Sequence, residues 1–248
     1  MENFDQPKIT PEQQEPAKAG EGKIAYRFET PIYPGNIVYV NLVDNYKCVN
    51  DCEFCSRPRT QEDVGKPNIY EQKAGTSLHL KKSPSTEQVM QALESEMRDD
   101  DQEVAIIGLG EPLIHLQKVA EVIKQIKEKY DKKTRLDTNG LAKCIHPDKD
   151  SAKLLKEAGL DEIRISLNAT DEEEYRNLCK PKYKNAFDKL LEFIRECQDL
   201  GIDTHVSFVI NFESDNVASK SRQDYEDFAI SLGIEPDHII FREYVKPV

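Results

Sequence analysis

Three cysteines lie close together in this chain, at Cys48, Cys52 and Cys55 in the stretch YKCVNDCEFCSRPR. A closed structural zinc site needs four ligands and a disulfide needs two thiols, so three thiols fit neither. Thiolates are soft ligands that suit zinc, copper(I) or iron–sulfur clusters. A [4Fe–4S] cluster held by three thiolates keeps a fourth iron free for a substrate or cofactor, as an open zinc site does. The spacing therefore favours an iron–sulfur site.

Two alternatives stay open on these residues alone. One is a zinc site completed by a distant histidine, although the nearest histidines, His79 and His115, are not at zinc-finger spacing. The other is a set of buried thiols that bind no metal. Of the widely spaced cysteines, we expect Cys197 in the core of an amphipathic helix, and we treat Cys179 as a weak candidate for a catalytic thiol.

Composition excludes several broad classes of protein. The net charge of −12 makes nucleic-acid binding unlikely, and no apolar run is long enough to span a membrane. The first 22 residues are rich in Glu, Gln, Pro and Lys, have no apolar segment of a secretory signal, and are expected to form a disordered tail. We expect residues 23–248 to form one core domain, with no C-terminal domain for auxiliary clusters, and the protein to be cytoplasmic.

From residue 36 onward, extended segments alternate with amphipathic helical segments, which is typical of parallel strands joined by right-handed crossovers. The fold class we predict is α/β, a partial (β/α)6 TIM-type barrel with helices outside; an open doubly wound sheet is the other arrangement of such units. Residues 23–30 are expected to pair with the first of these strands, and residues 64–84 to form a long loop. The predicted strands span residues 36–44, 103–110, 134–140, 162–168, 203–211 and 238–244, and the helices 83–97, 115–130, 150–159, 185–201 and 221–233.

Unusual residues follow the first four of these strands. The cysteine segment comes after the first, GLGEP after the second, DTNG after the third and SLNA after the fourth. The carboxyl ends of parallel strands meet at one edge of a sheet or barrel, so these segments should lie together. In EIRISLN, period-2 alternation should turn Ser166 and Asn168 inward if Ile163 and Ile165 pack under helices.

The cysteine segment, C-x3-C-x2-C with Phe54 before the last cysteine, resembles that of the radical S-adenosylmethionine (radical SAM) superfamily. GLGEPL resembles the GGE segment of that family, with Leu109 where the first glycine usually stands. The resemblance covers about residues 36–244. A narrower likeness, in RLDTNGLAKCIHP and ISLNATDEEEYRNLCKPKY, is to the small TatD-associated radical SAM proteins.

The resemblance implies an enzyme that cleaves SAM reductively at a [4Fe–4S] cluster and abstracts hydrogen from an unidentified substrate through a 5′-deoxyadenosyl radical. It implies a one-electron reductant such as a flavodoxin or ferredoxin. It assigns the cluster to Cys48, Cys52 and Cys55. It assigns SAM contacts to Phe54, Gly110, Glu111, Thr138, Asn139, Ser166 and Asn168. Arg242 and Tyr244 are weak candidates for substrate contacts.

Two other functions are weighed against this one. GLGEPL also resembles the RNA-modifying radical SAM enzymes, but these need a cysteine late in the chain, and none follows Cys197. A non-catalytic iron–sulfur or zinc-binding scaffold would have no use for Gly110, Glu111 and Asn168. One departure from the family is that its GxIxGxxE pattern near the fifth strand is absent, with HVSFVINFESD in its place.

Overall fold

The computed structural model describes residues 22–28, 35–60, 62–66, 68–214, 217 and 220–244. The predicted tail lies outside these residues except for Gly22. None of the helices in the described ranges is long and apolar enough to cross a membrane.

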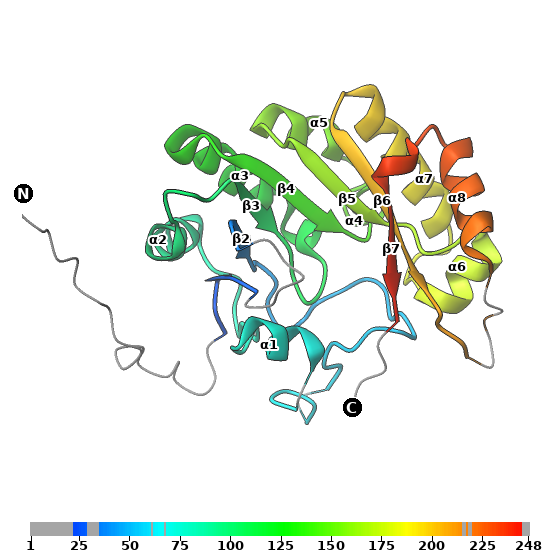
Figure 1. Ribbon diagram of the computed structural model, residues 1–248, viewed down its shortest axis with the longest axis horizontal. Coiled ribbons are helices and arrows are strands. Elements are labelled where there is room, and N and C mark those ends of the chain that lie inside the picture. The colour runs from blue at the N-terminus through cyan, green and yellow to red at the C-terminus, as the bar shows by residue number, and fades with distance from the viewer. Residues whose placement is uncertain are drawn as a thin grey trace, which may run out of the picture.

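One sheet of seven strands runs through the molecule, and its strands follow one another in chain order. The short β1 (Ala25–Tyr26) pairs antiparallel with β2 (Ile37–Val40), as predicted. The remaining strands pair in parallel, each with the next, and the sheet is not closed. They are β3 (Glu103–Ile106), β4 (Lys133–Thr138), β5 (Glu162–Ser166), β6 (Asp203–Ile210) and β7 (Ile239–Glu243). The predicted partial barrel of six parallel strands is confirmed (Figure 1).

All five predicted helices are present. They are α2 (Thr86–Glu96), α3 (Leu116–Tyr130), α5 (Ser151–Ala158), α7 (Ala186–Asp199) and α8 (Arg222–Ser231). The described chain also contains short elements that apolar periodicity did not reveal: α1 (Ile69–Ala74), η2 (Pro112–His115), α4 (Ala142–Ile145), α6 (Glu172–Cys179) and η3 (Pro236–His238).

The prediction that residues 64–84 form only a loop is wrong, because α1 lies within them. The side chain of Asn68 accepts hydrogen bonds from the amides of Tyr70 and Glu71, and Gly75 ends the helix with φ +61°. Asn at the start of a helix and Gly at its end are the usual capping residues. These local caps define a helix of six residues that is too short to show apolar periodicity.

The main core lies between the sheet and the helices outside it (Figure 1). Every second strand residue faces this core, and Val38, Val104, Ile163 and Ile165 are completely buried there. Burying a side chain of this size stabilises the fold by about 1.5–3 kcal/mol. The opposite face of the sheet is called the inner face below. It carries the aromatic cluster of Tyr26, Phe28 and Tyr39 and, on β4 to β7, mostly polar side chains.

Candidate active site

The carboxyl ends of four adjacent strands meet at one edge of the sheet. The cysteine loop, residues 48–55, follows β2, and Gly110 and Glu111 follow β3. Asn139 follows β4 and Asn168 follows β5. The strand order therefore places these segments at one edge of the sheet, as predicted.

The end of helix α6 holds the cysteine loop in place. The amide of Asp51 donates to the carbonyl of Cys179 at 3.0 Å, and the amide of Glu53 donates to that of Leu178 at 3.0 Å. The amide of Lys182 donates back to the carbonyl of Val49 at 2.9 Å. The loop thus gains backbone partners although it belongs to no regular element. Helix α6 was not predicted from the sequence. Its start signal is Asp171, which precedes three glutamates, and the Asp171 side chain accepts a hydrogen bond from the Glu174 amide at 2.8 Å.

The three thiols have different electrostatic surroundings. Burial, and to a smaller extent the nearby Glu111 carboxylate, raise the pKa of Cys48 to about 12. Burial also raises the pKa of Cys55. A hydrogen bond with Cys179 lowers the pKa of Cys52, and the positive charge of Arg57 contributes in the same direction. A buried thiol of high pKa becomes a thiolate when a cation replaces its proton, as metal binding does.

The three sulfur atoms do not all lie within the short range that one shared zinc ion requires. One tetrahedral zinc ion with Zn–S bonds of about 2.3 Å needs sulfurs about 3.8 Å apart. Within the described ranges, only one group of three His, Cys, Asp or Glu ligand atoms lies entirely within 4.8 Å, and it contains none of these cysteines. A [4Fe–4S] cluster distributes its thiolates over separate irons and so needs wider spacing.

Two buried polar atoms, one in the loop and one just after it, are unpaired. Among the residues that the structure describes, Asn50 Oδ1 and Ser56 Oγ have no hydrogen-bond partner. Leaving such a buried atom unpaired costs about 1–3 kcal/mol, so a native fold normally supplies a partner. The sulfides of a cluster accept hydrogen bonds, so a cluster would suit the Ser56 hydroxyl, whereas Asn50 Oδ1 needs a donor from another group.

Gly110 allows the loop after β3 to approach the cysteine loop. Its φ is +151°, and a Cβ atom there would lie 2.6 Å from both the Lys47 carbonyl oxygen and Val43 Cγ1. The next amide, that of Glu111, donates to the same Lys47 carbonyl at 2.8 Å. Only glycine fits this conformation and this contact.

The Glu111 carboxylate is buried and accepts three hydrogen bonds. Its Oε1 accepts from the Leu113 amide at 2.8 Å and from Thr138 Oγ1 at 2.7 Å, and its Oε2 accepts from the Asn139 amide at 2.7 Å. Burial outweighs these bonds and raises the pKa of Glu111 to about 7. A carboxylate has about four acceptor positions, so one position on Oε2 stays open.

Asn139 connects this carboxylate with the cysteine loop. Its amide donates to Glu111, and its Nδ2 atom lies 3.6 Å from Cys48 Sγ. Its Oδ1 accepts from the Leu141 amide at 3.0 Å, which fixes the side chain. The residues predicted from GLGEP and DTNG thus contact each other and one predicted cluster ligand.

Ser166 and Asn168 lie at the next strand end in different surroundings. Ser166 is half-buried on the face opposite Ile163 and Ile165, as the alternation predicts. Asn168 has φ +59° and is buried, and its Oδ1 accepts from the Val209 amide at 3.0 Å. Its amide also lies beside the Cys179 thiol. Asn168 therefore joins the end of β5 to β6 and α6.

The remaining candidates lie in three different places. Cys179 is completely buried beside Cys52. Phe54, Phe212 and Tyr244 form a continuous aromatic series, with ring centroids 6.1 Å and 4.8 Å apart. Arg242 is partly exposed on β7 and lies 3.4 Å from Asp137 Oδ2. The roles of these residues stay predictions.

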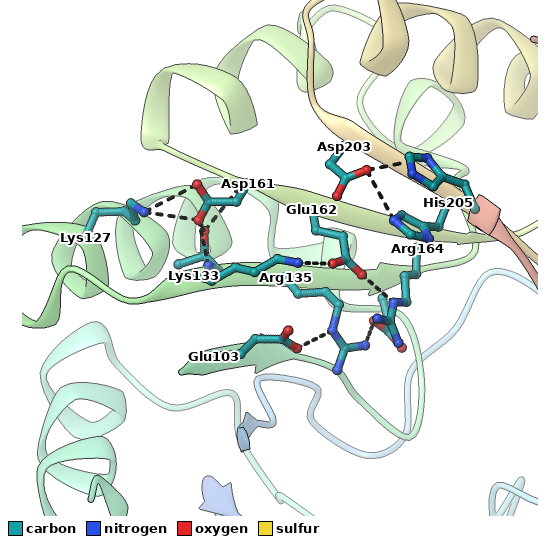
Figure 2. Close-up of polar contacts among 12 residues, drawn as sticks. Glu103, Lys127, Lys133, Arg135, Asp161, Glu162, Arg164, Asp203 and His205 are labelled. Carbon is teal, nitrogen blue, oxygen red and sulfur yellow. Dashed lines mark hydrogen bonds and ion pairs between the residues drawn. The ribbon is translucent and has the colours of Figure 1, made fainter. Parts of the chain in front are cut away.

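A network of charged side chains crosses the inner face of the sheet below this edge (Figure 2). Arg135 contacts Glu103 and Asp137, each at 2.5 Å, and Arg164 contacts Glu162 at 2.5 Å. Sequence reasoning missed Arg135 and Asp137. Their signal was present in KTRLDTN, where alternate residues are polar, but the register that pairs them with β3 and β5 is a property of the folded sheet.

Comparison with known proteins now identifies the family. Residues 43–219, more than half of the chain, match the model of the family described as the radical SAM superfamily. The chain belongs to the radical SAM superfamily. Members are enzymes that bind a [4Fe–4S] cluster and SAM, which they cleave with an electron from an external reductant. The narrower likeness to TatD-associated proteins stays a prediction.

Curated radical SAM relatives include proteins named probable GTP 3′,8-cyclase. The one from Saccharolobus islandicus (strain Y.N.15.51 / Yellowstone #2) is 29% identical over 132 residues, 53% of this chain and 39% of the relative. The one from Methanococcus maripaludis (strain C7 / ATCC BAA-1331) is 27% identical over 132 residues, 53% of this chain and 37% of the relative. The chain spans about two fifths of the length of these relatives.

Solved radical SAM structures share the fold. Streptococcus suis SuiB bound to S-adenosylmethionine matches with a TM-score of 0.55 at 16% identity, over 85% of this chain and 38% of that one. The enzyme anSMEcpe with bound AdoMet also matches with a TM-score of 0.55 at 16% identity, over 86% of this chain and 52% of that one. At this level of identity, the likeness shows a common radical SAM fold.

Proposed function

We propose that this chain is a radical SAM enzyme whose cluster and SAM bind at the carboxyl edge of β2 to β5, and that it abstracts hydrogen from a polar substrate held on the inner face of the sheet. The cluster is held by Cys48, Cys52 and Cys55. The SAM site is formed by Phe54, Gly110, Glu111, Thr138, Asn139, Ser166 and Asn168. Residues 23–248 act as one core domain, of which the matched residues 43–219 are a part.

The observation that supports this proposal most strongly is the double contact of Asn139 with Cys48 and Glu111. These three residues come from the ends of three different strands, β2, β3 and β4. A metal ligand and a buried carboxylate with an open acceptor position are thereby placed next to each other. A ligand that carries an ammonium group and also coordinates iron fits between them.

When bound, the cluster and SAM supply the radical chemistry: one electron breaks the C5′–S bond of SAM and yields a 5′-deoxyadenosyl radical that takes a hydrogen atom from the substrate. The chain itself positions and shields the reactants. Glu111 accepts a hydrogen bond from the amino group of SAM through its open Oε2 position. Phe54 provides an apolar surface for adenine, and the buried strand ends exclude water from the reacting atoms.

The inner face of the sheet favours a substrate that carries an anionic group. Arg164 uses its Nε atom to bind Glu162, and within the described part of the chain its two Nη groups make no hydrogen bond. Arg242 is partly exposed and binds Asp137 through only one long contact. Guanidinium groups with free donors bind carboxylates and phosphates in pairs of parallel hydrogen bonds.

GTP is a second, more specific candidate because the curated relatives are named probable GTP 3′,8-cyclases. Its triphosphate would match Arg164 and Arg242. We expect GTP to increase the rate of SAM cleavage by the reconstituted enzyme if it is the substrate. An unchanged rate with a full cluster would eliminate GTP without affecting the assignment of the SAM site.

The reductant we propose is an acidic electron carrier such as a flavodoxin or ferredoxin. Lys182 and Lys184 are exposed in the segment after α6 that contacts the cysteine loop. Lys180, in the same segment, pairs with Glu53 of the loop at 2.8 Å. In a chain of net charge −12, this local group of lysines favours an acidic partner near the cluster.

Electron paramagnetic resonance tests the proposed SAM site. The protein is reconstituted with iron and sulfide without oxygen, reduced, and measured with and without SAM. We expect SAM to shift the spectrum of the reduced cluster, and we expect Glu111→Gln to weaken this shift while the iron content is kept. A spectrum that SAM does not change in a protein with four irons per chain would contradict the proposal.

A further inference from the structure

Asp203, His205 and His238 form a second group of metal-type ligands, at the opposite end of β6 from the cysteine loop. Asp203 Oδ1 lies 3.2 Å from His205 Nε2 and 3.5 Å from His238 Nδ1. One ligand atom from each of the three residues lies within 4.8 Å of the other two. Figure 2 shows Asp203 and His205 side by side at one end of the charged network.

The fold itself brings these three residues together. Asp203 is the first residue of β6, and His205 follows two positions later on the same face of the strand. Val206 pairs with Ile239, so the preceding residues, His205 and His238, lie next to each other on neighbouring strands. Their rings stack with centroids 4.1 Å apart and an interplanar angle of 16°.

Two of the three separations between ligand atoms match those around one tetrahedral ion. Metal–ligand bonds of about 2.0–2.1 Å require neighbouring ligand atoms about 3.3–3.4 Å apart. The two measured separations from Asp203 Oδ1, 3.2 Å and 3.5 Å, lie on either side of that value. Two imidazoles and a carboxylate are ligands that zinc and similar divalent ions accept.

We propose that Asp203, His205 and His238 bind one divalent cation of the zinc class, with three protein ligands and a fourth position open at the amino-terminal end of the sheet. The ion links the start of β6 to the start of β7, the last strand of the sheet. From Asp203 to Ile210 the strand rises by about 23 Å, so the site is separate from the cluster.

The test uses tag-free, full-length protein with its cluster already reconstituted, because apo cysteines also bind zinc. The protein is incubated with Zn²⁺ without oxygen, desalted and analysed for both metals. We expect one zinc in addition to four irons per chain, and a higher melting temperature in zinc. Zinc absorption spectroscopy (EXAFS) should show nitrogen and oxygen neighbours without sulfur.

Variants separate this site from unspecific binding. His205→Gln and His238→Gln should each keep four irons and bind zinc about tenfold more weakly or worse, since loss of even an outer partner of a ligand weakens binding about tenfold. Asp203→Asn provides a conservative third variant if a histidine variant fails to fold. Glu235→Gln is the matched control: it removes a nearby exposed charge that makes no capping hydrogen bond, and it should bind zinc like the wild type.

Either of two results would overturn the proposal. One is zinc that remains bound in the double variant His205→Gln/His238→Gln at wild-type affinity. The other is zinc with sulfur neighbours in the wild-type protein, which would assign the ion to the cysteines. Both results are independent of SAM cleavage, so they leave the proposed function of the cluster site untouched.

Discussion

Cys52 lies at the centre of the cysteine loop, and its backbone carbonyl accepts hydrogen bonds from Cys55 and from Arg59. Replacing Cys52 by alanine removes one thiolate that we assign to the cluster. We expect Cys52→Ala to lose the cluster, because two thiolates cannot hold three irons of a cubane. Iron and sulfide analysis after anaerobic reconstitution measures this effect.

Cys197→Ala is the matched control for this prediction. Cys197 is a buried cysteine that lies in α7 within the main core. Its replacement should lower the free energy of unfolding by about 1 kcal/mol and leave four irons in place. A full iron content in Cys52→Ala would refute the assignment of that ligand.

Glu111 gives the cluster-free protein a characteristic dependence of stability on pH. Burial raises its pKa from the usual 4.5 to about 7, so the folded chain binds this proton more tightly than the unfolded chain. The stabilisation is complete below about pH 4.5 and is lost as the pH rises toward 7, by about 3 kcal/mol in total. Urea unfolding between pH 5 and 8 should show this loss in the wild type and not in Glu111→Gln. Parallel curves for the two proteins would exclude a raised pKa.

At the scale of elements, Gly110 determines how closely the loop after β3 approaches the cysteine loop. Gly110→Ala adds a Cβ atom 2.6 Å from the Lys47 carbonyl in a backbone conformation that strains any other residue. We expect a loss of about 1–3 kcal/mol in the free energy of unfolding and weaker SAM binding. Denaturant unfolding and the SAM-induced spectral shift measure the two effects.

The variant Gly65→Ala is a control that has the backbone strain expected for Gly110→Ala without the close contact to Lys47. Gly65 also has a positive φ, +88°, but a Cβ atom there would meet nothing within 4 Å. This variant should lose a similar amount of stability from backbone strain alone and should bind SAM normally. Equal SAM binding by both variants would show that the contact between the two loops does not shape the site.

The elements that could be predicted from sequence are those with a long periodic pattern. Helices such as α3 and α7 bury one apolar face, and parallel strands end at one edge, so the positions of Gly110, Glu111 and Asn139 followed from the alternation. The short α6 could not be found in this way, because its first turn is acidic and its role is to hold the cysteine loop through backbone contacts.

Contacts that depend on strand register or on side-chain rotamers could not be predicted from the sequence either. The sequence indicated that Glu111 and Asn139 lie at neighbouring strand ends, but not that one donates its amide to the other. It indicated Arg242 as a candidate for substrate contacts, but not that Arg242 lies beside Asp137 of β4. His205 and His238, 33 positions apart, become neighbours only because β6 and β7 pair in the observed register.

At the scale of the whole molecule, the lysines beside the cysteine loop predict that an acidic carrier protein docks there to reduce the cluster. We expect Lys182→Glu/Lys184→Glu to slow reduction of the cluster by an acidic flavodoxin, and the effect should shrink at high salt. Reduction by dithionite, a small chemical reductant, should be unaffected. Stopped-flow absorbance of the cluster measures both rates, and equal slowing with both reductants would argue against a docking surface.

A second double variant, with its substitutions on helices away from the cysteine loop, controls for the change in net charge. Lys124 and Lys153 are exposed on α3 and α5, away from the cysteine loop, so Lys124→Glu/Lys153→Glu makes the same change in total charge. This variant should be reduced by flavodoxin at nearly the wild-type rate. The comparison isolates the local lysines from the overall charge of the chain.

The most direct test of the whole account is the product that the reduced protein makes from SAM. Reconstituted without oxygen, the wild-type chain should hold about four irons, and after reduction it should convert SAM to methionine and 5′-deoxyadenosine, detected by liquid chromatography and mass spectrometry. Cys52→Ala should form neither product. A reduced wild-type protein with a complete cluster that forms no 5′-deoxyadenosine, with any polar substrate tested, would contradict the assignment of this edge of the sheet as a SAM-cleaving active site.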